Sequence, residues 1–198
     1  LTAIRHQYPT STLGSGAARL EIGDVYAREP KSVLVEFFVP GVPDSESNER
    51  DIVVAHISLT AHVLTEGGGV ERQEIVFPVV TRLSAPGHAE PEVRREMLLL
   101  DAAKAREDAL RMRDEGDLGG AASMLRAMSV RMAMAPQDVG EEFAAELREQ
   151  SADLDDVASQ FSRAEVSEED AKYLAQRAYN AHRGKRAYEA KLSRRKPQ

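Results

Sequence analysis

The chain of 198 residues has no cysteine and no apolar run near the ~18 residues that a membrane helix needs. Without cysteine, a disulfide framework, a thiolate metal site and a cysteine nucleophile are excluded. The first residues, LTAIRHQYPT, lack an initiator Met as well as the basic region and apolar core of a signal peptide. We therefore expect a cytoplasmic protein in which Leu1 follows an internal cut. Hydrophobic residues at 42% and charged residues at 30% are typical of a soluble globular protein.

The sequence also lacks the short motifs of common catalytic and metal sites. There is no HExxH pair and no GxSxG elbow. His56 and His62 share a strand face, but six residues at about 3.3 Å each place them ~20 Å apart, too far to bind one metal ion. We interpret the helical carboxylates as a solvated face; they include Glu141, Glu142, Asp153, Asp155 and Asp156. We expect no enzyme activity, and no catalytic residue, metal ion or cofactor in this chain.

Charge is distributed unevenly along the chain. Residues 182–198 carry seven basic side chains and one acidic one, so their net charge is +6, and the total of −7 leaves −13 on the other residues. A nucleic-acid-binding fold is expected to present a broad basic face, which an acidic body does not offer. The basic tail is either solvated, docked on the acidic body or in contact with a polyanion. Its candidate interaction residues are Arg183, Lys185, Arg186, Arg194, Arg195 and Lys196.

Up to Pro86 the apolar residues recur with the two-residue period of β-strands. In VAHISLTAHV the alternation is regular, which is typical of an antiparallel sheet with one face in water. In EIVFPVVTRL, Pro78 favours an edge strand or a bulge. The glycines at 67–69 separate these two strands and predict a hairpin turn. The strands that we expect lie at 2–8, 18–22, 33–39, 54–63 and 74–83. Together they predict an antiparallel β-sandwich-like domain over residues 1–85.

After Pro86 the apolar residues follow a helical period. Pro91 suits the first position of a helix, and an apolar stripe runs from Leu98 to Met112 at spacings of four and three. The break DEGDLGG separates this helix from a second one. The stretch AREDALRMRDEGDLGGAASMLRAM is similar to one tetratricopeptide-like (TPR-like) hairpin with its turn at Gly116. A single hairpin cannot bury its own face, so it either packs in a helical bundle or offers a peptide-binding groove.

Two further helices are predicted by their start signals. Asp138 followed by Glu141, and Ser167 followed by Asp170, have the spacing of a capping box. Residues 86–198 are therefore predicted to form an α-helical domain of about four helices with the basic tail at its end. The fold class predicted for the whole chain is α+β. Some methionines either fill the helical core or supply an adaptable contact surface; these are Met124, Met132 and Met134.

The order of these elements resembles part of a known family. The strands in HQYPT and ARLEIGDVYAREPKSVLVEFFVPG, the helices in VRREMLLLDAAKARE and GDLGGAASML, and the basic helix YLAQRAYNAHRGKR are similar to the region after the von Willebrand factor type A (VWA) domain in a group of bacterial proteins. The resemblance covers nearly the whole chain. It implies a β-sandwich that supports the VWA domain, followed by a helical segment. In that family the VWA domain binds a divalent cation through a D-x-S-x-S loop and thereby grips an acidic group on a partner.

The metal-binding loop of that family has no counterpart in this chain. The nearest string, DSES at 44–47, has a different spacing and lies in a loop. The resemblance therefore implies that Mg²⁺ binds only in an absent VWA domain. We expect a non-enzymatic structural support and protein–protein interaction region, whose partner is another protein, the VWA domain of the same polypeptide or a second copy in a homodimer. The alternatives are nucleic-acid or polyanion binding by the basic tail and an enzyme accessory domain, and no membrane contact is expected.

Overall fold

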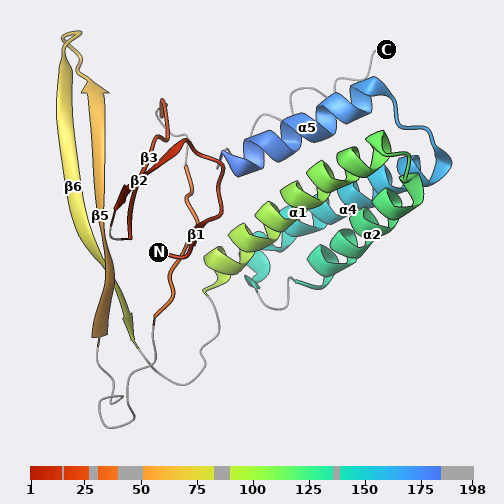
Figure 1. The fold of residues 1–198 in the computed structure, drawn as a ribbon, viewed down its shortest axis with the longest axis horizontal. Helices are drawn as coiled ribbons and strands as arrows, with labels where there is room; N and C mark the ends of the chain where they lie inside the picture. The colour runs from red at the N-terminus through yellow and green to blue at the C-terminus, as the bar shows by residue number, and fades with distance from the viewer. Residues whose placement is uncertain (15, 27–30, 40–50, 83–89, 136–138, 184–198) are drawn as a thin grey trace. The chain divides into compact units, whose positions relative to one another are not determined.

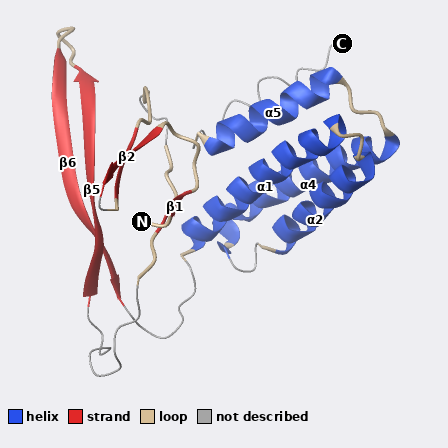
Figure 2. Cartoon of the chain, in the orientation of Figure 1, coloured by secondary structure: helices blue, strands red, loops and turns tan. Residues whose placement is uncertain are grey.

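The structure is a computed structural model, which describes residues 1–14, 16–26, 31–39, 51–82, 90–135 and 139–183 (Figure 1). The strands are β1 (Ala3–Ile4), β2 (Thr10–Gly14), β3 (Ala17–Leu20), β4 (Val35–Glu36), β5 (Asp51–Leu64) and β6 (Val70–Arg82). The helices are α1 (Pro91–Asp114), α2 (Leu118–Met134), α4 (Glu141–Arg163) and α5 (Glu168–His182). Strands thus precede helices along the chain (Figure 2), which confirms the predicted α+β class and its four helices.

The described strands form three separate two-stranded antiparallel sheets. β1 pairs with β4, β2 pairs with β3, and β5 pairs with β6. The predicted sandwich is not seen in these ranges. Alternating apolar residues indicate which face of a strand is buried, but they do not indicate which other strands the sheet contains. The strand at 33–39 is shorter than predicted, since only Val35–Glu36 is paired, and β2 was not predicted.

The chain divides into two compact units. One contains residues 1–36 and 89–198, and the other contains residues 37–88. The second unit consists mainly of the β5–β6 hairpin, whose strands are paired from Asp51–Arg82 to Leu64–Val70 with a bulge near residue 54. The predicted domain boundary between residues 85 and 86 lies outside the described residues and stays a prediction.

The predicted hairpin turn between β5 and β6 is confirmed. The Thr65 carbonyl accepts from the Gly68 amide at 2.9 Å, and the Thr65 amide donates to the Gly69 carbonyl at 2.9 Å. Gly68 has φ +76°, the left-handed conformation that glycine adopts without a steric cost. A left-handed glycine at this position is common in three-residue hairpin loops.

Local sequence signals account for most helix ends. Gly116, with φ +84°, turns the chain between α1 and α2, and the Asp117 carboxylate caps α2 by accepting from the Gly120 amide at 2.8 Å. The predicted capping box of α5 is confirmed, since the side chains of Ser167 and Asp170 each accept from the backbone amide of the other. The start of α4 differs from the prediction. Its N-cap is Gly140, and Asp138 lies outside the described residues.

The main core lies among the helices. Helix α2 packs against both α1 and α4, and α5 packs against α1. Small side chains on α1 and α2 allow close packing; they include Ala102, Ala105, Ala109, Ala121 and Ala122. Larger side chains that are fully buried fill the remaining space, among them Leu125, Met132, Leu147, Leu154 and Phe161. Each such residue contributes about 1.5–3 kcal/mol through burial. Core filling is thus confirmed for Met132, whereas Met134 is 70% exposed.

The N-terminal segment belongs to the helical unit because it is fastened to α1 and to the end of α5. The Gln7 amide donates to the His182 carbonyl at 2.9 Å, and the Tyr8 hydroxyl donates to the Arg183 carbonyl. The buried His6 ring accepts from the Leu34 amide at Nδ1 (2.8 Å), and its Nε2 lies 3.3 Å from Glu96 on α1. Residues that are distant in sequence are joined here by backbone and side-chain hydrogen bonds.

Candidate functional site

Arg183 is the one predicted interaction residue that lies in the described part of the chain. Its guanidinium carbon lies 5.8 Å from the ring centre of Tyr8 and 5.6 Å from that of Tyr179. Both distances fall within the range of cation–π contacts. Arg183, the C-cap residue of α5, is therefore in contact with its own body, and the docking of the tail stays a prediction. The other candidates fall in the undescribed range 184–198: Lys185, Arg186, Arg194, Arg195 and Lys196.

His56 and His62 do not come together in the hairpin. His56 and His62 are exposed and lie opposite Pro78 and Arg72 in the hairpin. The described ranges contain no cluster of three or more His, Cys, Asp or Glu side chains that could hold a metal ion. The DSES string is outside these ranges. In the same ranges, no helix is both long enough and apolar enough to span a membrane.

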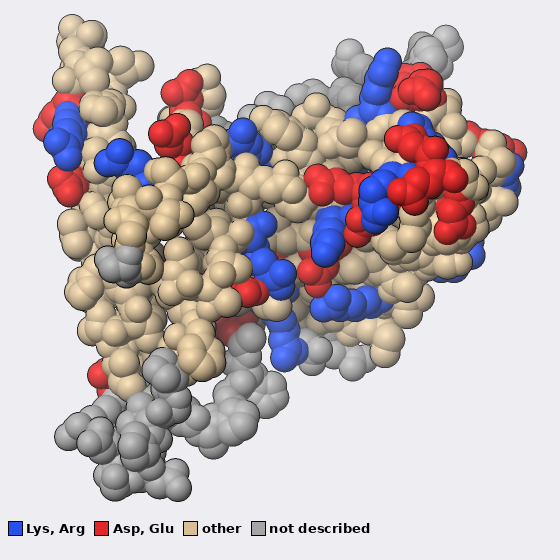
Figure 3. Space-filling model, in the orientation of Figure 1, with Lys and Arg blue, Asp and Glu red and all other residues tan. Residues whose placement is uncertain are grey.

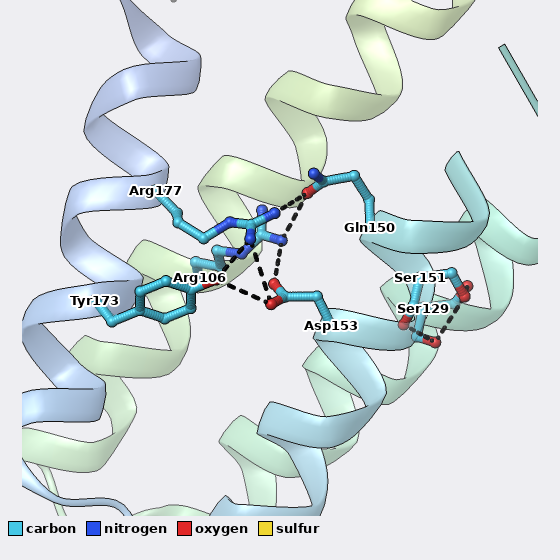
Figure 4. Close-up of polar contacts among 7 residues, drawn as sticks. All are labelled: Arg106, Ser129, Gln150, Ser151, Asp153, Tyr173 and Arg177. Atoms are coloured by element: carbon cyan, nitrogen blue, oxygen red, sulfur yellow. Dashed lines mark hydrogen bonds and ion pairs between the residues drawn. The ribbon is translucent and has the colours of Figure 1, made fainter. Parts of the chain in front are cut away.

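One predicted surface residue is instead buried, and this corrects the interpretation of Asp153 as part of a solvated face. Asp153 on α4 is only 8% exposed, whereas the side chains of Asp155 and Glu141 are 59% and 86% exposed. Figure 4 shows its carboxylate directed at two guanidinium groups. Arg106 Nη2 on α1 is 3.0 Å from Asp153 Oδ2, and Arg177 Nη1 on α5 is 3.4 Å from Oδ1.

Two neutral side chains complete this cluster, the buried Gln150 and Tyr173, which is 37% exposed. Gln150 Oε1 accepts from Arg106 Nη2 at 3.0 Å and from Arg177 Nη2 at 2.8 Å. The Tyr173 hydroxyl accepts from Arg177 Nη1 at 2.7 Å and donates to Asp153 Oδ1 at 3.3 Å (Figure 4). One hydrogen-bond network therefore joins three helices, α1, α4 and α5.

The electrostatics of this network follow from its burial. Two cations share one carboxylate, and Arg106 is 2% exposed. Burial lowers the pKa of Arg106, and the charge of Asp153 offsets only part of that effect. Arg106 Nε is buried and makes no hydrogen bond to the described residues. The cluster contains no nucleophile beside a base and no open metal position, so its geometry favours a fastening role over catalysis.

A second buried arginine fixes the beginning of α4 against α1. Arg95 is 2% exposed and binds Glu146 through two hydrogen bonds, Nε to Oε2 at 2.6 Å and Nη2 to Oε1 at 2.8 Å. Its guanidinium carbon also lies 5.2 Å from the ring centre of Phe143. Burial by itself lowers the pKa of Arg95, but the hydrogen bond and charge of Glu146, together with the charges of Glu96 and Glu92, outweigh burial, so the pKa is raised.

The signal for these arginines was present in the sequence. Arg106 follows Ala102 by four residues and precedes Ala109 by three, so it lies within the apolar stripe of α1. A charged residue at a stripe position implies either a buried partner or a break in the helix. The partner itself could not be identified, because Asp153 is 47 residues away and resembles its exposed acidic neighbours in sequence.

The β5–β6 hairpin carries an apolar face whose side chains are partly exposed. Ile57 lies opposite Phe77 and Leu59 lies opposite Ile75, and these four side chains are between 36% and 57% exposed. We call them the apolar face. Most of the hairpin surface visible in Figure 3 is uncharged, whereas Lys, Arg, Asp and Glu are mixed across the visible surface of the helices. A contiguous apolar surface of this kind is typical of an interaction site.

No family model, curated protein or solved structure matches this chain. The VWA and TPR-like resemblances therefore stay predictions.

Proposed function

We propose that this chain is a non-enzymatic support and protein-interaction region, in which the helices form the supporting body and the β5–β6 hairpin supplies the contact surface. The observation that carries the proposal is the apolar face of Ile57, Leu59, Ile75 and Phe77. An isolated two-stranded hairpin is only marginally stable in water. A covering protein surface removes the exposed parts of these side chains from water, which contributes on the order of 1 kcal/mol each.

The helical unit has the properties of a support. Its apolar residues form one core, and its buried charges are fastened by the Arg106–Asp153 and Arg95–Glu146 pairs. The N-terminal segment is held at His6, Gln7 and Tyr8. We expect a unit with this many internal contacts to be rigid, so that it can hold an attached domain in a fixed position.

The proposal includes the β-sandwich, the VWA domain and the cytoplasmic location that were predicted from the sequence. A further sheet over the apolar face completes the predicted sandwich and supports a VWA domain in a cytoplasmic protein. In that arrangement Mg²⁺ binds only in the VWA domain, so contacts made by the present chain do not depend on the cation.

The test is capture of proteins from a lysate of the source organism, in Mg²⁺ and in EDTA, with matched hairpin variants. A double variant, I75S with F77S, removes two residues of the apolar face. The control V76S changes the residue between them, which is 61% exposed on the opposite face. We expect the wild type and V76S to capture the same protein in both conditions and the double variant to lose it.

Two outcomes contradict the proposal. If the double variant still captures the protein, recognition does not depend on Ile75 and Phe77. If capture by the wild type requires Mg²⁺, the contact is not independent of the cation. Circular dichroism of the helices establishes that the supporting body is unchanged in each variant.

A further inference from the structure

We propose that the free edge of β5 pairs antiparallel with β5 of a second copy of this chain, so that two hairpins form one four-stranded sheet. This inference rests on the proposed function, because it names the partner of the hairpin. Among the described strands, β5 is paired with β6 on one side only. Strand addition at such an edge is a recurrent mode of protein recognition.

The hydrogen-bond phase of the hairpin determines which backbone groups face outward. The Thr65 amide donates to Gly69, so this pair belongs to the hydrogen-bonded set. In an antiparallel ladder, hydrogen-bonded and non-hydrogen-bonded pairs alternate. Following the register back along β5, the odd-numbered residues from Val63 to Ile57 bond to β6. The even-numbered residues from His56 to Leu64 therefore direct their N–H and C=O groups to the free edge.

The same alternation of hydrogen-bonded pairs shows that the free edge of β6 cannot pair with a further strand along its whole length. Pro78 lies opposite His56, in the non-hydrogen-bonded set, so its ring nitrogen faces the free edge of β6. Proline has no N–H to donate there, and its ring fills the space that a partner strand needs. The outward residues of β6 also include the charged Arg72 and Glu74. Of the two edges of the hairpin, only that of β5 has an unbroken set of donors and acceptors.

The chemistry of β5 favours an identical strand as the partner. From Ile52 to Leu64 it contains no Lys, Arg, Asp or Glu, although edge strands commonly carry a charge that prevents such pairing. Two copies therefore meet without like charges opposite each other. Outward residues can hydrogen-bond only with outward residues, which are even-numbered in both copies, so a two-fold axis perpendicular to the sheet relates the strands. The apolar faces of the two copies then lie on the same side of one sheet.

The absence of cysteine from the chain permits a direct test. In the registers centred on residue 59 or 60, a cysteine at the axis faces its own copy at a Cβ separation of about 4.5–5.5 Å, from which a disulfide forms with small movements. The variants are L59C and T60C. Their matched controls are I75C and E74C, at the cross-strand partners of these residues on β6. We expect disulfide-linked dimers from at least one β5 variant and from neither β6 variant.

A proline substitution provides a second test that needs no cross-link. S58P removes an outward N–H from β5 without removing a backbone bond to β6, although it also removes the hydrogen bond from the Ser58 hydroxyl to Glu74 Oε1. V76P removes an outward N–H at the cross-strand partner on β6. Sedimentation of the wild type over about a hundredfold range of concentration is expected to show a species of about twice 21.8 kDa. V76P is expected to retain this species and S58P to lose it. A wild type that stays monomeric throughout, or β6 cysteines that cross-link as efficiently as β5 cysteines, overturns the proposal.

These results are separable from those that test the proposed function. A monomeric wild type whose capture still depends on Ile75 and Phe77 rejects the second copy and leaves the interaction region standing. A β5-linked dimer that captures nothing through the apolar face supports the second copy and rejects a separate partner.

Discussion

Arg106 on α1 and Asp153 on α4 form an ion pair inside the helical unit, with 3.0 Å between Nη2 and Oδ2 and side chains that are 2% and 8% exposed. The same carboxylate faces Arg177 on α5. Removing charges from water is costly, so such a pair adds little net stability relative to well-packed apolar residues. The ion pairs therefore fix how the three helices are arranged, because any other arrangement separates the Asp153 carboxylate from Arg106 or Arg177.

Replacement of Asp153 tests this dependence. D153N keeps the shape of the side chain but leaves Arg106 and Arg177 without an anionic partner, so we expect the free energy of unfolding to fall by about 3–5 kcal/mol. Urea unfolding followed by circular dichroism of the helices measures the loss. The control is D155N, at a side chain that is 59% exposed and 4.0 Å from Arg126, where a change within about 0.5 kcal/mol is expected. A loss below about 1 kcal/mol for D153N contradicts the proposed fastening role.

The capping box of α5 predicts a dependence on pH. The Ser167 hydroxyl, and then the Ser167 amide, donate to the Asp170 carboxylate and lower the pKa of Asp170. Because the folded-state pKa is lowered, the stabilisation is fully present above the unfolded value of ~3.9 and is lost as the pH falls through the folded value.

We therefore expect S167A to destabilise the helices by about 1 kcal/mol at neutral pH and by less at about pH 3. Urea unfolding at the two pH values measures the difference. The control K172A, on the exposed side of the same helix, is expected to have a small effect that is equal at both. A cost of S167A that does not change with pH contradicts this assignment of the Asp170 charge.

Sequence patterns predicted most of the local structure. The helices α1, α2 and α5 begin and end near their predicted signals, because caps, glycine turns and apolar stripes act within a few residues. The hairpin was predicted for the same reason, since Gly67–Gly69 and the alternation on either side are local features. The sandwich was not seen among the described strands, because pairing between distant strands depends on contacts that no local pattern specifies.

The candidate site was predicted less well than the fold. The alternation of apolar residues in β5 was recognised from the sequence. Which of its residues direct their N–H and C=O groups to the free edge is known only from the hydrogen bond between Thr65 and Gly69. The buried state of Asp153 depends on Arg106 and Arg177, which lie on other helices. Both features arise from pairings that a single segment of sequence does not contain.

Ser129 and Ser151 provide a test of the packing between α2 and α4. Each buried hydroxyl donates to the backbone carbonyl of the other residue at 2.9 Å, and the two hydroxyl oxygens are 3.1 Å apart (Figure 4). We expect S129A and S151A each to cost about 1 kcal/mol, and the double variant to cost less than the sum by about 0.5–1 kcal/mol. S123A, at an exposed serine on α2, is the control with little expected effect. Additive single effects contradict a coupled pair.

Two adjacent glycines at the start of α2 are expected to respond differently to the same substitution. A Cβ at Gly119 lies 4.0 Å from the Asp117 carboxylate, whereas a Cβ at Gly120 lies 2.1 Å from it. G119A therefore gains helix propensity and is expected to stabilise the protein by about 0.5–1 kcal/mol. G120A gains the same propensity but displaces the Asp117 cap, which is worth ~1 kcal/mol, so its net effect is near zero. Urea unfolding of both variants measures the difference, and equal stabilisation by the two substitutions contradicts the role of Asp117 as the cap.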